Sequence, residues 1–375
     1  ETGKLATQAG GSVVVRMGNT MIFATAVSSK EAREGQSFFP LSVDYQEKFA
    51  AAGRIPGNFF RRETKLSDYE ILISRLVDRA IRPLFPEGYM NETQIIANLI
   101  SSDDDVLPDA LVALAVSSAL SVSDIPFAGP ISEVRVARVN GEFVINPNRT
   151  DLEEADIDLL VGATMDNVTM VEGEAKECSE KDLVEAIRQA HEAIKVQIQA
   201  QLDLAQKVGE KALEKREVEA LPEDEDIKAK VETLAKDKIY EVAKGALDKG
   251  ARKDRFSEIK EEVVAKFEEE HDEEYMEEKG ELIERYFDEL KKKVIREMVL
   301  SEGVRLDGRK PDEIRDIWCE IDYLPSTHGS AIFTRGETQS LTSVTLGSKI
   351  DEIMVDNALE MKKDDFILHY NFPPY

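Results

Sequence analysis

Cysteine, tryptophan and long apolar runs are scarce in this chain of 375 residues. Its two cysteines, Cys178 and Cys319, lie far apart and belong to no CxxC or Cys/His pattern. A disulfide scaffold or a zinc site is therefore not expected, and a reducing compartment is the better prediction. No apolar run reaches the roughly 18 residues that a membrane span requires, so no membrane partner is expected. Walker, GxGxxG and HExxH motifs are also missing from the sequence.

Positive charge is in short supply as well. The sequence has 48 Lys and Arg residues against 75 Asp and Glu, a formal net charge of -27. This balance argues against general adhesion to nucleic acid or to an anionic membrane, because a basic surface is what neutralises phosphates. It leaves room for a local basic site on an acidic body.

Charged residues are concentrated in one part of the chain. Between residues 201 and 300, 51 of 100 residues are charged, whereas only about a quarter of the rest are. Apolar residues recur there at helical spacing, as in Ile227, Val231 and Leu234. Pro222 precedes Glu-Asp-Glu-Asp, which suits the start of a helix because acidic side chains interact favourably with its N-terminal dipole. We predict a bundle of amphipathic helices with solvated, ion-paired faces; an acidic partner-binding module is the alternative.

The rest of the chain has the pattern of an α+β fold. Short apolar runs at 13–15 and 21–27 flank Gly18-Asn19, which predicts a hairpin. Helical periodicity predicts helices at 66–84, 107–122 and 182–204, and the second is apolar enough to lie in the core. Further strands are expected at 39–45, 93–100, 131–138, 143–145, 157–162 and 168–172.

A pattern from the N-terminal part returns near the end of the chain. Residues 11–20 align without gaps on residues 329–338, each with Gly-Ser, three apolar residues, and a Gly two positions before a Thr. The next strand aligns in three apolar positions, Phe39 on Phe366, Leu41 on Leu368 and Tyr45 on Phe372. The shared order of strand, turn and strand favours duplication. Because a full copy should need about 200 residues, we expect that the chain stops inside the second copy. The sequence has no initial Met, so a start inside a longer sequence is also an open expectation.

Several motifs carry a family resemblance. Residues 305–315, RLDGRKPDEIR, resemble the opening signature of the ribonuclease PH family. More specific motifs resemble the bacterial polynucleotide phosphorylases of that family, and they are GRIPGNFFRR at 53–62 followed by Glu63, IRPLFP at 81–86, TRGETQ at 334–339 and HYNFPPY at 369–375. The resemblance covers nearly the whole chain.

The resemblance implies an α+β architecture with a ribonuclease PH-like core of the ribosomal protein S5 domain 2-like kind. An all-helical linker domain and the start of a second such core would follow. The expected bounds are 1–205 for the first, non-catalytic core, 206–298 for the linker domain and 299–375 for the truncated second core.

The resemblance also implies a phosphorolytic exoribonuclease of the cytoplasm. It would degrade single-stranded RNA from the 3′ end with inorganic phosphate as co-substrate and would release nucleoside diphosphates. A homotrimer is implied, with an RNA-degradation complex as a candidate partner. Mg²⁺ or Mn²⁺ is the implied cofactor, and its ligands are expected beyond Tyr375.

The first copy departs from the pattern of active family members. Their phosphate loop is rich in Ser and Gly, whereas the matching stretch at 101–108 contains Asp103, Asp104 and Asp105, which would repel phosphate. A metal site there is one interpretation, and a solvated loop that caps the following helix is favoured. Of the carboxylate cluster of active members, only Asp156 and Asp158 find a counterpart. We therefore predict no catalytic residue and no metal ligand within these 375 residues.

One loop combines aromatic and basic side chains, and its predicted RNA-binding residues are Phe59, Phe60, Arg61 and Arg62. Aromatic rings stack on any base and guanidinium groups follow phosphates, as a grip on a single strand requires. From composition alone, a loop whose Phe pair packs inward and whose Arg pair forms surface ion pairs is equally well supported. The resemblance, in which this loop narrows an RNA channel, favours RNA contact. Arg54 is a weaker candidate on the same loop.

The sequence gives less support for a functional role of the other basic residues and histidines. Arg75, Arg79 and Arg82 form one helical stripe, and the expected role is pairing with acids of the same helix, Asp68, Glu70 or Asp78. Arg335 lies in a strand turn, where solvation and a place in a cleft are equally supported. His328 and His369 lack a nearby carboxylate-and-nucleophile arrangement, so neither is assigned a catalytic role.

Two functions of different classes remain. The first is the front part of a phosphorolytic exoribonuclease, which supplies RNA-channel and subunit contacts but not the full active site. The second is a non-catalytic RNA-binding or scaffold protein on the same fold. A Ser/Gly phosphate loop and an aspartate cluster after Tyr375 would distinguish the enzyme.

Overall fold

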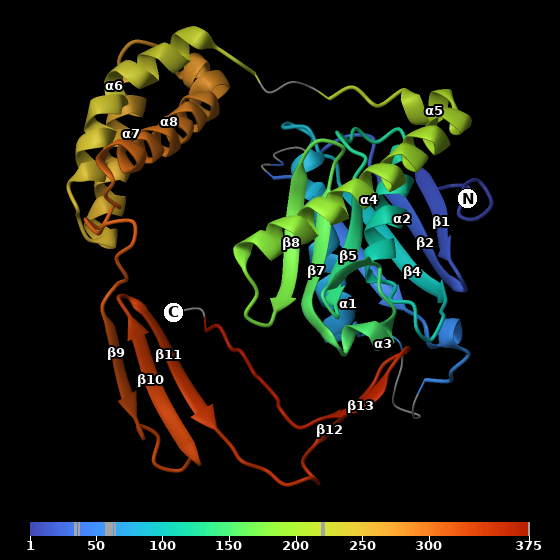
Figure 1. Ribbon diagram of the computed structural model, residues 1–375. Coiled ribbons are helices and arrows are strands. Elements are labelled where there is room, and N and C mark those ends of the chain that lie inside the picture. Colours follow the sequence, from blue (N-terminus) through green and yellow to red (C-terminus); the bar gives the residue numbers. More distant parts are fainter. Residues whose placement is uncertain (34–35, 37, 57–62, 64, 219–221, 374–375) are drawn as a thin grey trace. The chain divides into compact units, whose positions relative to one another are not determined.

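The computed structural model describes residues 1–33, 36, 38–56, 63, 65–218 and 222–373 (Figure 1). The chain forms two compact units. One consists of residues 1–220 together with 349–375, and the other of residues 221–348. Along the described parts of the chain, no helix has the length and apolar character needed to cross a membrane.

The first sheet of the larger unit begins with the predicted hairpin. β1 (Gly11–Met17) and β2 (Thr20–Ser28) pair antiparallel, and Gly18 takes a φ of 60° in the turn. β4 (Thr93–Ser101) pairs antiparallel with β2, and β3 (Leu41–Glu47) pairs parallel with β4. Burial alternates along β2, as expected when one face of a sheet meets the core. The hairpin and the strands expected at 39–45 and 93–100 are confirmed.

Two helices cover the inner face of this sheet. α1 (Asp68–Ile81) begins with a capping box, in which Ser67 Oγ accepts from the Glu70 amide at 3.2 Å and Glu70 Oε2 accepts from the Ser67 amide at 2.6 Å. A short 3-10 helix, Arg82–Leu84, follows α1 and contains Pro83. α2 (Asp109–Ser121) contacts β1, β2 and β4 on one side and β5 (Ser132–Val139) on the other. It therefore lies in the core, as its apolar composition predicted.

A second sheet and a long helix complete the larger unit (Figure 1). The sheet has the order β6-β5-β7-β8 and is antiparallel throughout. α4 (Glu180–Val208) packs on β5, β6 and β7. The unit thus has four layers: sheet, helices, sheet and helix. The remaining elements are β6 (Glu142–Ile145), α3 (Arg149–Leu152), β7 (Ala155–Ala163), β8 (Val168–Ala175) and α5 (Glu210–Leu213).

The second unit contains the predicted helical bundle. Its helices are α6 (Glu225–Lys244), α7 (Lys249–Glu268) and α8 (Glu273–Glu302). Asp224 caps α6 by accepting from the amides of Asp226 and Ile227, both at 3.1 Å, which confirms the helix start predicted after Pro222. The apolar stripes meet in a core that includes Ile227, Val231, Val263, Phe267 and Phe287.

The repeated motif forms the same local structure in both copies. β10 (Gly329–Arg335) and β11 (Thr338–Val344) pair antiparallel, and β9 (Ile317–Ile321) pairs with β10. The Arg335↔Thr338 pair closes this hairpin as the Met17↔Thr20 pair closes the first. Gly336 has a φ of 59°, close to that of Gly18. The duplicated hairpin predicted from the sequence is therefore confirmed.

The prediction of a strand at 366–372 is wrong, because these residues have no regular secondary structure. A hairpin of β12 (Ile353–Asp356) and β13 (Met361–Asp364) precedes them instead. The corresponding strand of the first copy, β3, lies at the edge of its sheet and pairs parallel with β4. A strand needs such a partner for its backbone hydrogen bonds, and the described residues provide none for 366–372. The domain bounds at 205 and 298 stay predictions; α4 and α8 continue through both positions.

Candidate functional site

The predicted RNA-binding residues Phe59, Phe60, Arg61 and Arg62 lie outside the described residues. The chain on either side of them returns to one place, the short 3-10 helix Phe49–Ala52. On the entry side, Gly53 ends that helix with a left-handed φ of 64°. On the exit side, Glu63 Oε1 accepts a hydrogen bond from the Phe49 amide at 2.8 Å. Both ends of the predicted loop are thus held at the same short helix.

Arg54, the weaker RNA candidate, binds another part of the chain. Its Nη2 lies 2.6 Å from Asp356 Oδ1. Its Nη1 donates to the carbonyl oxygens of Asn357 at 2.6 Å and Ala358 at 3.2 Å. The guanidinium also lies 5.5 Å from the centroid of the Phe49 ring. The donors of Arg54 are therefore directed at the turn between β12 and β13.

The acidic loop of the first copy is tied to neighbouring loops. The Asp103 amide donates to Thr20 Oγ1 at 3.0 Å, and Asp105 Oδ1 accepts from both the amide and the hydroxyl of Thr150 at 3.2 Å. The expectation that this loop caps the following helix is wrong. Pro108 is the N-cap residue of α2 and makes no side-chain cap bond, because it has no side-chain acceptor.

Asp156 and Asp158 on β7 each bind an arginine of the neighbouring strand. Arg138 donates to Asp156 from Nε at 2.8 Å and from Nη2 at 2.7 Å, and these bonds lower the pKa of Asp156. Arg135 Nη1 lies 2.6 Å from both Asp158 oxygens, while its Nη2 donates to Asp109. Within the described ranges, no three His, Cys, Asp or Glu side chains are grouped to hold a metal ion. These carboxylates form ion pairs.

Two glutamates of the same core have raised pKa values. Burial raises the pKa of Glu133 to about 8, and the charge of Asp109 adds to this effect. Neither Glu133 oxygen has a hydrogen-bond partner among the described residues. Burial also raises the pKa of Glu47 to about 7, although the hydrogen bond that Tyr45 donates at 2.9 Å opposes the shift. Both groups therefore hold a proton at a pH where an exposed glutamate is ionised.

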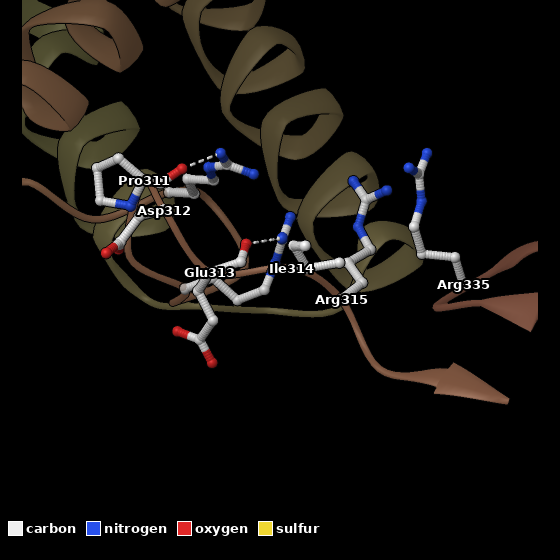
Figure 2. Close-up of a pocket in the computed structure, with 8 residues that line it drawn as sticks. Pro311, Asp312, Glu313, Ile314, Arg315 and Arg335 are labelled. Carbon is white, nitrogen blue, oxygen red and sulfur yellow. Dashed lines mark hydrogen bonds between the residues drawn. The ribbon is translucent and has the colours of Figure 1, made fainter.

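Four of the described arginines line a pocket of about 290 Å³ in the second unit (Figure 2), and they are Arg305, Arg309, Arg315 and Arg335. Residues 311–314 form the rest of its lining. Arg305 donates to the Pro311 carbonyl, and Arg309 Nη1 donates to the Glu313 carbonyl at 2.6 Å, so both arginines shape this segment. Arg315 and Arg335 extend their guanidinium groups in the same direction (Figure 2). The arrangement offers clustered cationic donors to an anion.

Gly336 allows the close packing beside this pocket. Its amide donates to the Asp316 carbonyl at 3.0 Å, and a Cβ built on Gly336 would lie 2.7 Å from Arg315 Cδ. The sequence left two interpretations of Arg335 open, solvation in a turn or a place in a cleft. In the structure Arg335 lines the pocket, which agrees with the second. Sequence reasoning did not single out Arg305, Arg309 and Arg315 as binding residues. The signal was present, because all three lie in the RLDGRKPDEIR motif.

Other candidates have structural partners. Arg82 pairs with Asp78 at 2.7 Å, as expected for one helix. Arg79 pairs instead with Glu172 of β8 at 2.7 Å, which corrects the expected pairing within the helix. The α1 helix contacts β8, so an acid from the sheet reaches Arg79. His328 Nδ1 accepts from the Leu346 amide at 2.9 Å, a bond within the sheet region.

Comparison with known sequences decides the family. Residues 1–126 and 313–375, together about half of the chain, match the description "3′ exoribonuclease family, domain 1". Residues 129–193 match domain 2 of the same family. The chain belongs to the 3′ exoribonuclease family. Residues 226–310 match "Polyribonucleotide nucleotidyltransferase, RNA binding domain".

Curated relatives in this family carry the name polyribonucleotide nucleotidyltransferase. The relatives from Christiangramia forsetii and Phocaeicola vulgatus are 56% identical to this chain, and a relative from Bacteroides fragilis is 55% identical. Each match covers 100% of this chain but 49%, 52% and 52% of the respective relative. The chain thus spans about half the length of these members of the 3′ exoribonuclease family.

The 3′ exoribonuclease family match also accounts for the internal repeat. Domain 1 of the family matches twice, once over each duplicated hairpin. The arginine-lined pocket lies where two matches meet. Arg305 and Arg309 fall in the match to the RNA binding domain, whereas Arg315 and Arg335 fall in the second match to domain 1.

Proposed function

We propose that the protein acts as a polyribonucleotide nucleotidyltransferase that shortens single-stranded RNA from its 3′ end. The observation that carries the proposal is 55–56% identity over the whole chain to relatives of that name. In this reaction an oxygen of inorganic phosphate attacks the phosphorus of the terminal nucleotide. The bond from that phosphorus to the 3′ oxygen of the preceding nucleotide breaks. The products are a nucleoside diphosphate and an RNA one nucleotide shorter.

The arginine-lined pocket supports a phosphate-binding role within this function. Its lining combines four guanidinium groups with the carboxylates of Asp312 and Glu313. Asp307 also pairs with Arg309 at 2.9 Å and with Arg315 Nε at 3.6 Å, and the four arginines still leave one net positive charge against these three carboxylates. Guanidinium groups bind phosphate oxygens in pairs and offset negative charge as it develops in a transition state. Arg315 and Arg335 are the residues that we assign to the phosphate, because their guanidinium groups extend together (Figure 2).

The first core has a different role in the proposal. Its carboxylates Asp156 and Asp158 are engaged by Arg138 and Arg135, so we assign it RNA holding rather than catalysis. The grip on RNA is assigned to Phe59, Phe60, Arg61 and Arg62. The proposal includes a homotrimer in the cytoplasm, an RNA-degradation complex as partner, and Mg²⁺ or Mn²⁺ held by residues beyond Tyr375. The metal ion would offset charge on the transferred phosphate group.

The test uses the natural full-length protein, end-labelled oligo(A), magnesium and inorganic phosphate. ADP should appear only when phosphate is present. A hydrolase would release AMP without phosphate, and a non-catalytic scaffold would release neither, so either result would refute the proposal.

The pocket is tested by the double variant R315A/R335A, which should raise the KM for phosphate roughly tenfold, the loss of about one charge-assisted hydrogen bond. The matched control is R188A, which removes an exposed arginine paired with Glu185 on α4. An unchanged KM in R315A/R335A would remove the pocket from the proposed mechanism.

A further inference from the structure

We propose that Arg54 is a positioning residue, which fastens the base of the RNA-contact loop to the turn between β12 and β13. This inference rests on the proposed function, because it assumes that residues 59–62 hold RNA. It assigns Arg54 a role other than RNA contact. It also links the first stretch that matches domain 1 of the family to residues 356–358 of the second such stretch, and both partners belong to the larger unit.

The turn that receives Arg54 is itself well fixed. The Asp356↔Met361 pair is the last of the β12–β13 ladder, and the Asn357 amide donates to the Glu360 carbonyl at 2.8 Å. Ala358 is only 3% exposed, and Leu359 packs against the core of the first sheet. The carbonyl oxygens of Asn357 and Ala358 are therefore held in place before Arg54 binds them.

The base of the loop is held on its other sides too. The Ser102 amide donates to the Ala51 carbonyl at 3.0 Å, which ties the short helix Phe49–Ala52 to the end of β4. Glu63 binds the Phe49 amide and lies 3.9 Å from Lys48 Nζ. Arg54 connects this base of the loop to the turn between β12 and β13 through its hydrogen bonds to residues 356–358. The 3-10 helix is thus a common anchor for both ends of the loop.

The chemistry of the contact requires arginine. One carboxylate and two carbonyl oxygens accept from two nitrogens of a planar group, which also packs on the Phe49 ring. A lysine would supply the charge without the planar fork. The side chains of Arg54 and Asp356 are 32% and 13% exposed, so the pair is partly shielded from water and from screening by salt.

A direct phosphate contact by Arg54 conflicts with this geometry. Its guanidinium already faces the Asp356 carboxylate, which repels phosphate. Removal of Arg54 should therefore misplace the loop but leave the number of phosphate contacts unchanged. Removal of the Asp356 charge separates the two roles. By simple electrostatics it should tighten RNA binding, whereas a positioning role predicts weaker binding.

The experiment measures the affinity of the 375-residue chain for labelled oligo(A) by fluorescence anisotropy, between about 50 and 200 mM salt. R54A, R54K and D356N should each bind roughly tenfold more weakly, about 1.4 kcal/mol. The slope of log affinity against log salt should stay that of the unsubstituted chain. R33A, which removes an exposed arginine paired with Glu92, is the matched control and should bind normally. Circular dichroism checks that each variant is folded.

Three outcomes would overturn the inference. The first is a salt slope reduced by about 0.7 in R54A, which would mark one lost phosphate contact. The second is full rescue of binding by R54K, and the third is tighter binding by D356N. A separate variant, R61A/R62A, tests the proposed function. If R61A/R62A binds RNA normally, the assignment of the loop fails. If R61A/R62A binds weakly while R54A binds normally, only the positioning role of Arg54 fails.

Discussion

The carboxylate of Asp105 accepts two hydrogen bonds from Thr150, one from its amide and one from its hydroxyl, each 3.2 Å long. Asp105 lies in the stretch after β4 that the family resemblance matched to a phosphate loop, and Thr150 lies in α3, just before β7. The pair therefore ties the loop after β4 to the short helix before β7. It also keeps a negative charge there, which opposes the binding of phosphate.

The 375-residue chain by itself should not phosphorolyse RNA. Its first copy has Asp103, Asp104 and Asp105 in the stretch that the family resemblance matched to a phosphate loop, and Asp156 and Asp158 are paired with arginines. Incubation of the purified chain with poly(A), magnesium and phosphate should release no ADP. ADP release at a rate comparable with that of the full-length protein would place a working site around Asp156 and Asp158 and would contradict this assignment.

Substitution of Arg135 should destabilise the larger unit strongly. Arg135 neutralises Asp109, whose side chain is only 1% exposed, and R135M would leave that buried carboxylate without this counter-charge. The expected loss is about 3–5 kcal/mol of unfolding free energy, measured by urea denaturation. The matched variant R138M removes the partner of Asp156 and Asp182, whose side chains are 42% and 41% exposed, so it should cost far less unfolding free energy than R135M. Equal losses in the two variants would show that burial of Asp109 is not the decisive factor.

The stability of the larger unit should fall as pH rises through the neutral range. The pKa of Glu133 is about 8 in the folded protein against an ordinary value of 4.5, so the folded state keeps a proton that the unfolded chain loses. Between these two values, this group lowers the unfolding free energy by up to about 1.4 kcal/mol per pH unit. Glutamine has no such proton, so the variant E133Q should show a flatter dependence in urea denaturation at several pH values. Glu47, with its pKa of about 7, should leave a residual slope. Parallel curves for E133Q and the unsubstituted protein would rule out titration of Glu133.

The two kinds of side chain in the RNA-contact loop should have separable effects on RNA binding. R61A/R62A should weaken binding and reduce its salt slope by up to about 0.7 per lost phosphate contact. F59A/F60A should cost roughly 1–3 kcal/mol per stacked base without a change of slope. Titration of labelled oligo(A) at several salt concentrations measures both. Normal binding and degradation of RNA by a full-length protein with all four residues replaced would show that the loop does not hold RNA.

The sequence by itself determined the local elements and the repeat. Helical periodicity located α1, α2 and α4, the charge-rich block predicted the bundle of α6, α7 and α8, and the two glycine turns predicted matching hairpins. These features are readable because the spacing of apolar residues, the capping residues and the glycine turns act within a few positions of one another. The motifs also carried the family resemblance, which the comparisons confirm.

Only the tertiary structure decided which distant residues meet. Arg54 binds a turn some 300 positions away, Arg79 binds β8 rather than its own helix, and Arg315 comes beside Arg335 because Gly336 leaves room for it. Long, flexible charged side chains reach several partners from one backbone position, so their sequence spacing does not select among them. Residues 366–372 likewise have strand-like spacing but form no strand, since a strand exists only where a neighbouring backbone supplies its hydrogen bonds.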